Sequence, residues 1–152
     1  MSIAGYSNTP LAKKLGLHDG QSVAFCGLPN SLEFLTEERS YSAIETRESW
    51  TQIEGADFDY MHLFTDRAAD VNGAIPAMRN QIKPDGMIWM SWPKKASKVP
   101  TDVTEDVIRN RALSDVLVDI KVCAVDEIWS GLKLVIRKEL RQTYQNSARR
   151  SD

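Results

Sequence analysis

The sequence has only two cysteines among its 152 residues, Cys26 and Cys123, and both fall within apolar stretches. A disulfide scaffold needs more cysteines and an oxidising compartment, so we expect a reduced protein. With two histidines and no cysteine cluster at ligand spacing, we predict no metal site. The sequence also lacks a secretory signal and any run of the roughly 18 apolar residues that a membrane helix needs. We therefore expect a cytoplasmic protein with no membrane partner.

A surplus of basic residues is also missing. The chain has 19 Lys and Arg against 21 Asp and Glu, a formal net charge of -2, which argues against general nucleic-acid binding. The hydrophobic content of 42% and charged content of 26% are typical of a globular protein. The length suits one domain whose core is large enough to be stable without disulfides or metal ions. We predict a flexible arm at residues 1–9, a single domain at 10–138 and a polar tail at 139–152.

Apolar runs that suit buried strands alternate with stretches of helical periodicity. This alternation predicts right-handed crossovers and a mostly parallel sheet covered by helices on both faces. The predicted fold class is α/β: a three-layer α/β/α sandwich of about six strands, like a reduced Rossmann domain. The predicted strands span residues 22–27, 41–46, 58–65, 87–92, 116–129 and 132–137, and the predicted helices span 10–17, 29–38, 66–82 and a segment from 102 onward.

Local signals predict where these elements end. Ser130-Gly131 is a turn so short that the last two strands must be antiparallel. Residues 83–86 (KPDG) predict a helix stop followed by a turn. Pro76 predicts a kink or a broken first half in its helix. Asp102, with Glu105 three residues on, predicts a capping box at the start of the last helix.

Several segments resemble known families. LGLHDGQSVAFCGLP, FDYMHLFT and KPDGMIWM are similar to the first, fourth and fifth strand regions of class I methyltransferases, a resemblance that covers most of residues 10–138. GYSNTPLAKKLG, WPKKAS, TDVTEDVIR and VDIKVCAVDEIWSGLKLV resemble a bacterial family catalogued as a domain of unknown function, DUF 3052. The first resemblance implies a Rossmann-like fold, and the second implies no particular activity.

The sequence departs from a working methyltransferase at the cofactor loop. Such enzymes place several glycines after the first strand, where backbone N–H groups approach the cofactor. Here residues 26–29 (CGLP) offer one glycine and a proline without an N–H donor. Glu45, Thr46 and Glu48 fit about equally well the position that would hold the ribose hydroxyls. The resemblance implies S-adenosylmethionine as a cofactor, whereas the depleted loop predicts none.

Candidate ligand-binding residues follow the predicted strands. Because ligands of open parallel sheets gather at the carboxyl ends of strands, these residues should share one rim. An aromatic face, two ammonium groups and a carboxylate suit a small anionic molecule with a flat ring. In the alternative interpretation, the carboxylate only caps a helix and the lysines are solvated. The residues are Gly27, Asp66, Trp92, Lys94 and Lys95.

No residue is predicted to be catalytic. His62 lies inside an apolar strand and Cys26 at the end of another, so we interpret both as core residues. The sequence therefore predicts a non-catalytic domain that binds a small anionic ligand or a partner protein. The alternatives are a divergent S-adenosylmethionine-dependent transferase and an interaction module anchored by Trp50 or Trp129.

Overall fold

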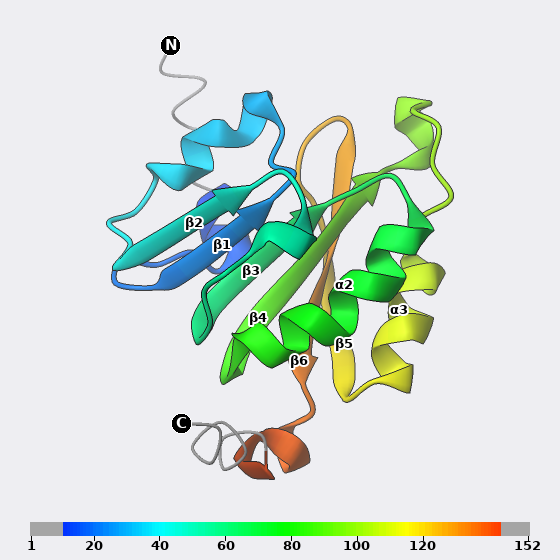
Figure 1. Cartoon of the computed structure of the whole chain (residues 1–152). Coiled ribbons are helices and arrows are strands. Elements are labelled where there is room, and N and C mark those ends of the chain that lie inside the picture. Colours follow the sequence, from blue (N-terminus) through cyan, green and yellow to red (C-terminus); the bar gives the residue numbers. More distant parts are fainter. Residues whose placement is uncertain (1–10, 144–152) are drawn as a thin grey trace.

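A six-stranded mixed sheet in the order β2-β1-β3-β4-β6-β5 organises the chain (Figure 1). Strands β2, β1, β3 and β4 are parallel, and β6 is antiparallel to both of its neighbours. The predicted α/β fold with a closing antiparallel hairpin is therefore confirmed. The strands of this computed structural model, which describes residues 11–143, are β1 (Ser22–Cys26), β2 (Ala43–Arg47), β3 (Phe58–Phe64), β4 (Ile82–Pro93), β5 (Leu117–Ala124) and β6 (Trp129–Ile136). The predicted N-terminal arm and residues 144–152 of the predicted tail lie outside the described residues.

Different helical segments cover the two faces of the sheet (Figure 1). On one face lie α2 (Ala68–Gln81) and α3 (Glu105–Ser114). The other face is covered by helical residues 11–15 and by the 3-10 helix η1 (Asn30–Thr36). Three further 3-10 turns are η2 (Trp50–Gln52), η3 (Lys95–Ser97) and η4 (Lys138–Leu140). Within residues 11–143, no helix has the length and apolar character needed to cross a bilayer.

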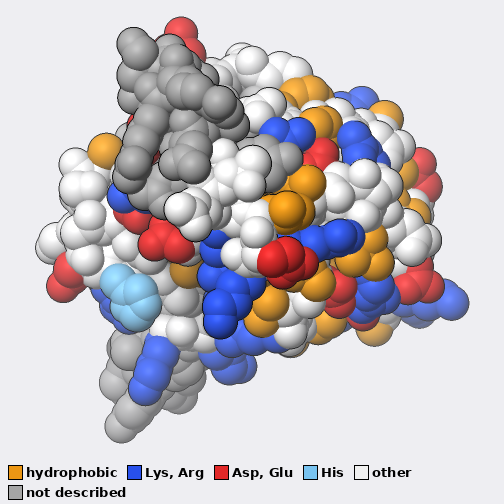
Figure 2. Space-filling model, turned by 90° about the horizontal axis from the view of Figure 1, so that it is seen from below, with side chains coloured by type: hydrophobic (Ala, Val, Ile, Leu, Met, Phe, Trp, Pro, Cys, Tyr) orange, Lys and Arg blue, Asp and Glu red, His pale blue; other side chains and the backbone are white. Residues whose placement is uncertain are grey.

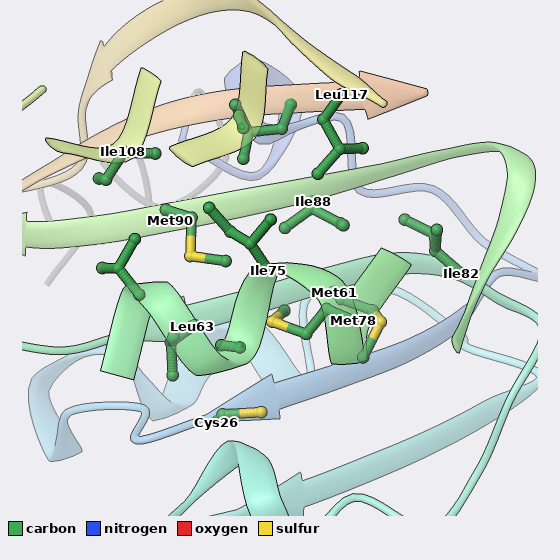
Figure 3. Packing of buried hydrophobic residues seen from close by; sticks show 14 of the residues in the cluster. Cys26, Met61, Leu63, Ile75, Met78, Ile82, Ile88, Met90, Ile108 and Leu117 are labelled. Atoms are coloured by element: carbon green, nitrogen blue, oxygen red, sulfur yellow. The ribbon is translucent and has the colours of Figure 1, made fainter. Parts of the chain in front are cut away.

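Strand alternation divides the apolar side chains into two clusters. Successive residues of a strand point to opposite faces, so Ala24 and Cys26 of β1 face α2, whereas Val23 and Phe25 face η1. Figure 3 shows the α2 side, where Met61 and Leu63 of β3 lie against Ile75 and Met78 of α2 and against Ile88 and Met90 of β4. The chain therefore buries apolar side chains on both faces of the sheet.

Helix α2 runs without interruption through Pro76, so the predicted broken first half is wrong. A proline inside a helix leaves the carbonyl four residues earlier without its N–H donor. Here that carbonyl belongs to Asn72, and the Nε of Arg111 on α3 donates to it at 3.3 Å. A neighbouring helix thus satisfies the acceptor that the proline leaves free.

Two predicted turns are also wrong. Residues 83–86 belong to β4, where a register shift opposite Phe58 and Tyr60 accommodates them. The last two strands turn at residues 125–128, because the Asp126 carboxylate accepts the N–H groups of Ile128 at 2.8 Å and Trp129 at 2.7 Å. Ser130-Gly131 lies within β6 instead.

The segment predicted as a helix at residues 29–38 is the shorter η1. Its buried residues, Leu32 and Leu35, are three apart, and a 3-10 helix places such residues on the same side. The strand predicted near the sheet edge is β2, which does lie at an edge. One face of this edge strand is open beside η1, and Ile44 is 44% exposed there.

Candidate ligand-binding edge

The carboxyl ends of the four parallel strands lie at one edge of the sheet, at the top of Figure 1. Gly27 directly follows β1, Asp66 lies two residues after β3, and Lys94 and Lys95 follow β4. The topology therefore places the predicted residues along the same edge.

Position 27 requires glycine, because the backbone at the end of β3 comes close to it. Its φ of +68° lies in the left-handed region, and its N–H donates to the Arg47 carbonyl at 2.9 Å. A Cβ at this position would lie 2.6 Å from the Phe64 carbonyl oxygen at the end of β3. Only glycine fits there, because both the backbone angle and the contact exclude a side chain.

Trp92 does not offer an aromatic face at this edge. The side chain is 8% exposed and packs in the core beneath α2 and α3. Lys95 is exposed and Lys94 is half-buried. The backbone N–H of Lys94 donates to the Ile128 carbonyl at 2.7 Å, which ties the loop after β4 to the β5–β6 turn. Of the predicted residues in this region, Lys94 and Lys95 are therefore accessible to solvent and the Trp92 ring is not.

Asp66 does not cap α2, contrary to the capping interpretation. The N-cap residue is Arg67, and it makes no side-chain capping bond. The Asp66 carbonyl accepts from the Thr101 hydroxyl at 2.7 Å, so the start of α2 is held against the loop that precedes α3. The Asp66 carboxylate is exposed and has no hydrogen bond or ion pair with any described residue.

The capping carboxylate of α2 comes from Asp102, which is distant in sequence. Its Oδ1 accepts the Ala68 N–H at 2.6 Å. The predicted capping box of Asp102 and Glu105 is therefore wrong. Helix α3 instead begins after Thr104, whose hydroxyl accepts the Val107 N–H at 3.1 Å.

Replacing Asp102 with alanine is expected to lower the free energy of unfolding by about 1 kcal/mol, because the α2 N-terminus loses its acceptor. Asp102→Asn keeps an acceptor oxygen and should lose less than half of that. Urea denaturation of both variants checks this expectation, with Glu127→Ala as a control for loss of an exposed carboxylate that has no hydrogen bond or ion pair within residues 11–143. Equal losses for the alanine and asparagine variants would contradict the capping role.

Neither tryptophan proposed as an anchor is exposed. Trp50 is half-buried, and its ring lies against Gly73 of α2 while its Nε1 donates to Asp70 at 3.4 Å. Trp129 is half-buried and meets the Phe64 ring edge-on, with 5.3 Å between centroids. Both rings stabilise the fold around the edge and do not project from it.

A hollow of about 810 Å³ opens beside η1 and the open face of β2. Of the five predicted residues, only Gly27 lines it. Its charged lining is mainly acidic, with three glutamates and one arginine, so it favours amine or hydroxyl groups on a ligand. The polar lining residues are Asn30, Glu33, Thr36, Glu37, Thr46, Arg47 and Glu48.

The structure separates the three candidates for the end of the second strand. The Glu45 carboxylate accepts the N–H groups of Glu54 at 2.8 Å and Gly55 at 2.9 Å, and it lies 3.1 Å from the Arg47 Nε. The Glu45 carboxylate is therefore already engaged by groups of the protein itself. Thr46 and Glu48 line the hollow.

The wall that η1 contributes to the hollow was not predicted from the sequence. Asn30, Glu33, Phe34 and Glu37 line the hollow, yet they read as an ordinary covering helix. The short η1 leaves part of β2 uncovered, and nothing in residues 29–38 alone indicates this. One usable signal was the short span between the first predicted strand and the strand predicted at residues 58–65, which leaves room for only one strand-helix unit.

His62 and Cys26 are both buried, as predicted. His62 is fully buried and is hydrogen-bonded to the Tyr60 hydroxyl at 2.8 Å and the Ser91 hydroxyl at 2.7 Å. Burial lowers the pKa of His62 to about 3. Burial, with a smaller contribution from Glu45, raises the pKa of Cys26 to about 12. At neutral pH both groups are uncharged and closed off from the hollow.

Comparison with known proteins gives no match to a family profile and none to a characterised protein sequence. Solved structures do match. A SAM-dependent methyltransferase from Aquifex aeolicus has a TM-score of 0.66 at 13% identity, covering 85% of this chain and 89% of that one. Magnesium protoporphyrin IX methyltransferase from Synechocystis PCC 6803, crystallised with bound SAM, has a TM-score of 0.61 at 13% identity, covering 89% and 78%.

A TehB-like SAM-dependent methyltransferase from Corynebacterium glutamicum has a TM-score of 0.60 at 9% identity, covering 86% of this chain and 88% of that one. These neighbours are class I methyltransferases, so this chain has a methyltransferase-like Rossmann fold. Identities this low establish the fold alone.

Proposed function

We propose that this protein binds a small molecule along the carboxyl edge of its sheet. The amine- or hydroxyl-bearing part of the ligand lies in the acidic hollow beside β2, and an anionic group faces Lys94 and Lys95. One observation carries the proposal: the edge has an acidic hollow at one end, and at the other it has Lys94 and Lys95, which form no ion pair with any residue from 11 to 143. Three strand spacings separate β2 from β4, about 14 Å, which a nucleoside-sized molecule spans.

The role that we propose is non-catalytic. The two side chains best suited to proton transfer or nucleophilic attack, His62 and Cys26, are buried and uncharged. Apart from Arg47, the ionisable side chains that line the hollow are all carboxylates. We also propose membership of the DUF 3052 family, on the strength of the four sequence strings that resemble it.

A second candidate is a divergent S-adenosylmethionine-dependent transferase. The observation that favours it is the fold shared with a methyltransferase solved with SAM bound. S-adenosylmethionine also carries ribose hydroxyls, an amine and a carboxylate, so it meets the same charge requirements. Gly27 and Pro29 argue against the usual mode of cofactor binding, because their loop offers few backbone N–H groups to a cofactor.

Native mass spectrometry of freshly purified protein, followed by calorimetric titration with S-adenosylmethionine and with adenosine monophosphate, tests both candidates. The binding proposal expects a retained molecule or saturable heat with one of these probes. Lys94→Ala/Lys95→Ala should weaken binding at least tenfold, and Glu48→Gln should weaken it less. Lys121→Ala is the matched control, because β5 is the strand at the opposite edge of the sheet from β2.

The outcomes separate the candidates. Micromolar S-adenosylmethionine binding with methyl transfer to any acceptor favours the transferase. Micromolar binding without turnover favours the binding domain. Unchanged affinity in the double lysine variant would contradict the proposed contact between these lysines and an anionic group of the ligand.

A further inference from the structure

Two lysines face each other across the β5–β6 hairpin. Lys133 of β6 lies directly opposite Lys121 of β5 in the antiparallel ladder. Directly opposed residues have Cβ atoms about 4.5–5.5 Å apart, and their side chains share a face of the sheet. On its other side, Lys133 lies opposite Trp89 of β4, which is fully buried. Lys133 thus lies between a buried aromatic residue and a like charge.

A bulge in β5 creates this pairing. The ladder shifts register between Asp119 and Lys121, with Ile120 as the extra residue. Asp119 points to the α3 side, where its carboxylate accepts from the Arg109 Nε at 3.0 Å. Lys121 points to the other side, because Cys123, two residues on, packs in the cluster of that face. Without the extra residue, Asp119 and Lys121 would share a face.

Lys133 also lacks an acidic partner, in contrast to the half-buried Lys83 and Arg109. Lys83 is paired with Asp59 at 2.9 Å, and Arg109 is paired with Asp119. Lys133 makes no ion pair or hydrogen bond with its side chain among residues 11–143. Burial, and then the charge of Lys121, lower the pKa of the Lys133 ammonium. At neutral pH a larger fraction of Lys133 than of an ordinary exposed lysine is therefore the neutral amine, which is the nucleophilic form.

We propose that Lys133 is a modification site that acyl thioesters acylate in preference to the exposed lysines of this protein. The lone pair of Nζ attacks the thioester carbonyl carbon and forms the amide C–N bond. The C–S bond breaks, the thiol leaves as thiolate, and the amine loses its proton to solvent. No oxidant or metal is needed. The acylated side chain no longer repels Lys121.

The test uses the full-length protein with the acetyl thioester of N-acetylcysteamine at pH 7.5. Peptide mass spectrometry follows the acetylation of each lysine over time. We expect Lys133 to react at least threefold faster than Lys95 and Lys98, which are exposed. Lys121→Ala removes the like charge and should slow Lys133 at least twofold. Lys98→Ala is the matched control and should leave the Lys133 rate unchanged.

A Lys133 rate equal to or below that of the exposed lysines overturns the proposal. A Lys133 rate that stays the same in Lys121→Ala overturns the role of the opposed charge. Circular dichroism of each variant confirms that it is folded before labelling. Labelling in 6 M guanidinium, where the pairing is lost, should equalise the lysine rates.

Discussion

Gly27→Ala is expected to lower the free energy of unfolding by about 3 kcal/mol. Two costs add here, since the backbone angle is unfavourable to alanine and the new Cβ would meet the Phe64 carbonyl oxygen at 2.6 Å. That oxygen belongs to the backbone at the end of β3, so the clash can be relieved only by moving a strand end. Urea denaturation monitored by tryptophan fluorescence measures the loss.

Gly20→Ala separates the two costs. Gly20 has a φ of +87°, but a Cβ there would have no neighbour within 4 Å. This variant pays only the left-handed backbone penalty, about 1 kcal/mol. If both variants lose the same stability, the close approach between β1 and β3 is not what demands glycine at residue 27.

His62 is expected to make the protein less stable in acid by about 3 kcal/mol between pH 7 and pH 4. Burial lowers the pKa of the folded-state imidazole from about 6.5 to about 3. Between these values the unfolded chain binds a proton that the folded protein does not, so stability falls as the pH falls. The loss begins below pH 6.5 and levels off near pH 3.

The measurement is the difference in unfolding free energy between pH 7 and pH 4, compared across variants. His62→Gln cannot titrate and should lose about 3 kcal/mol less than the parent over this interval. His18→Gln, at an exposed position, is the control and should behave like the parent. An identical acid response in all three proteins would show that His62 is accessible to protons in the folded state.

Much of the fold could be predicted from residue patterns. The strand around residues 87–92 and the helix around Ile75 and Met78 carry strong apolar periodicity, and their types are as predicted. The turns were harder to predict. Asp126 directs the hairpin turn through two backbone N–H groups, and Ser130-Gly131 mimics a turn although Gly131 is needed inside the sheet. At Gly131 a Cβ would meet the Trp89 ring at 3.0 Å.

The candidate site was less accessible to prediction, because it depends on contacts between distant segments. Capping of α2 by Asp102 joins residues 34 positions apart in the chain. The burial of Trp92 depends on how α2 and α3 cover β4, and the acidic hollow depends on the shortness of η1 beside an open edge strand.

The sequence by itself determined the fold class, the lone glycine of the first loop and the core positions of His62 and Cys26. These features follow from local periodicity and residue chemistry, which act over a few positions. Only the tertiary structure decided which carboxylates are occupied, which lysines lack a partner and where the edge is hollow. Those properties arise where segments far apart in the chain meet, and there long-range packing outweighs local preference.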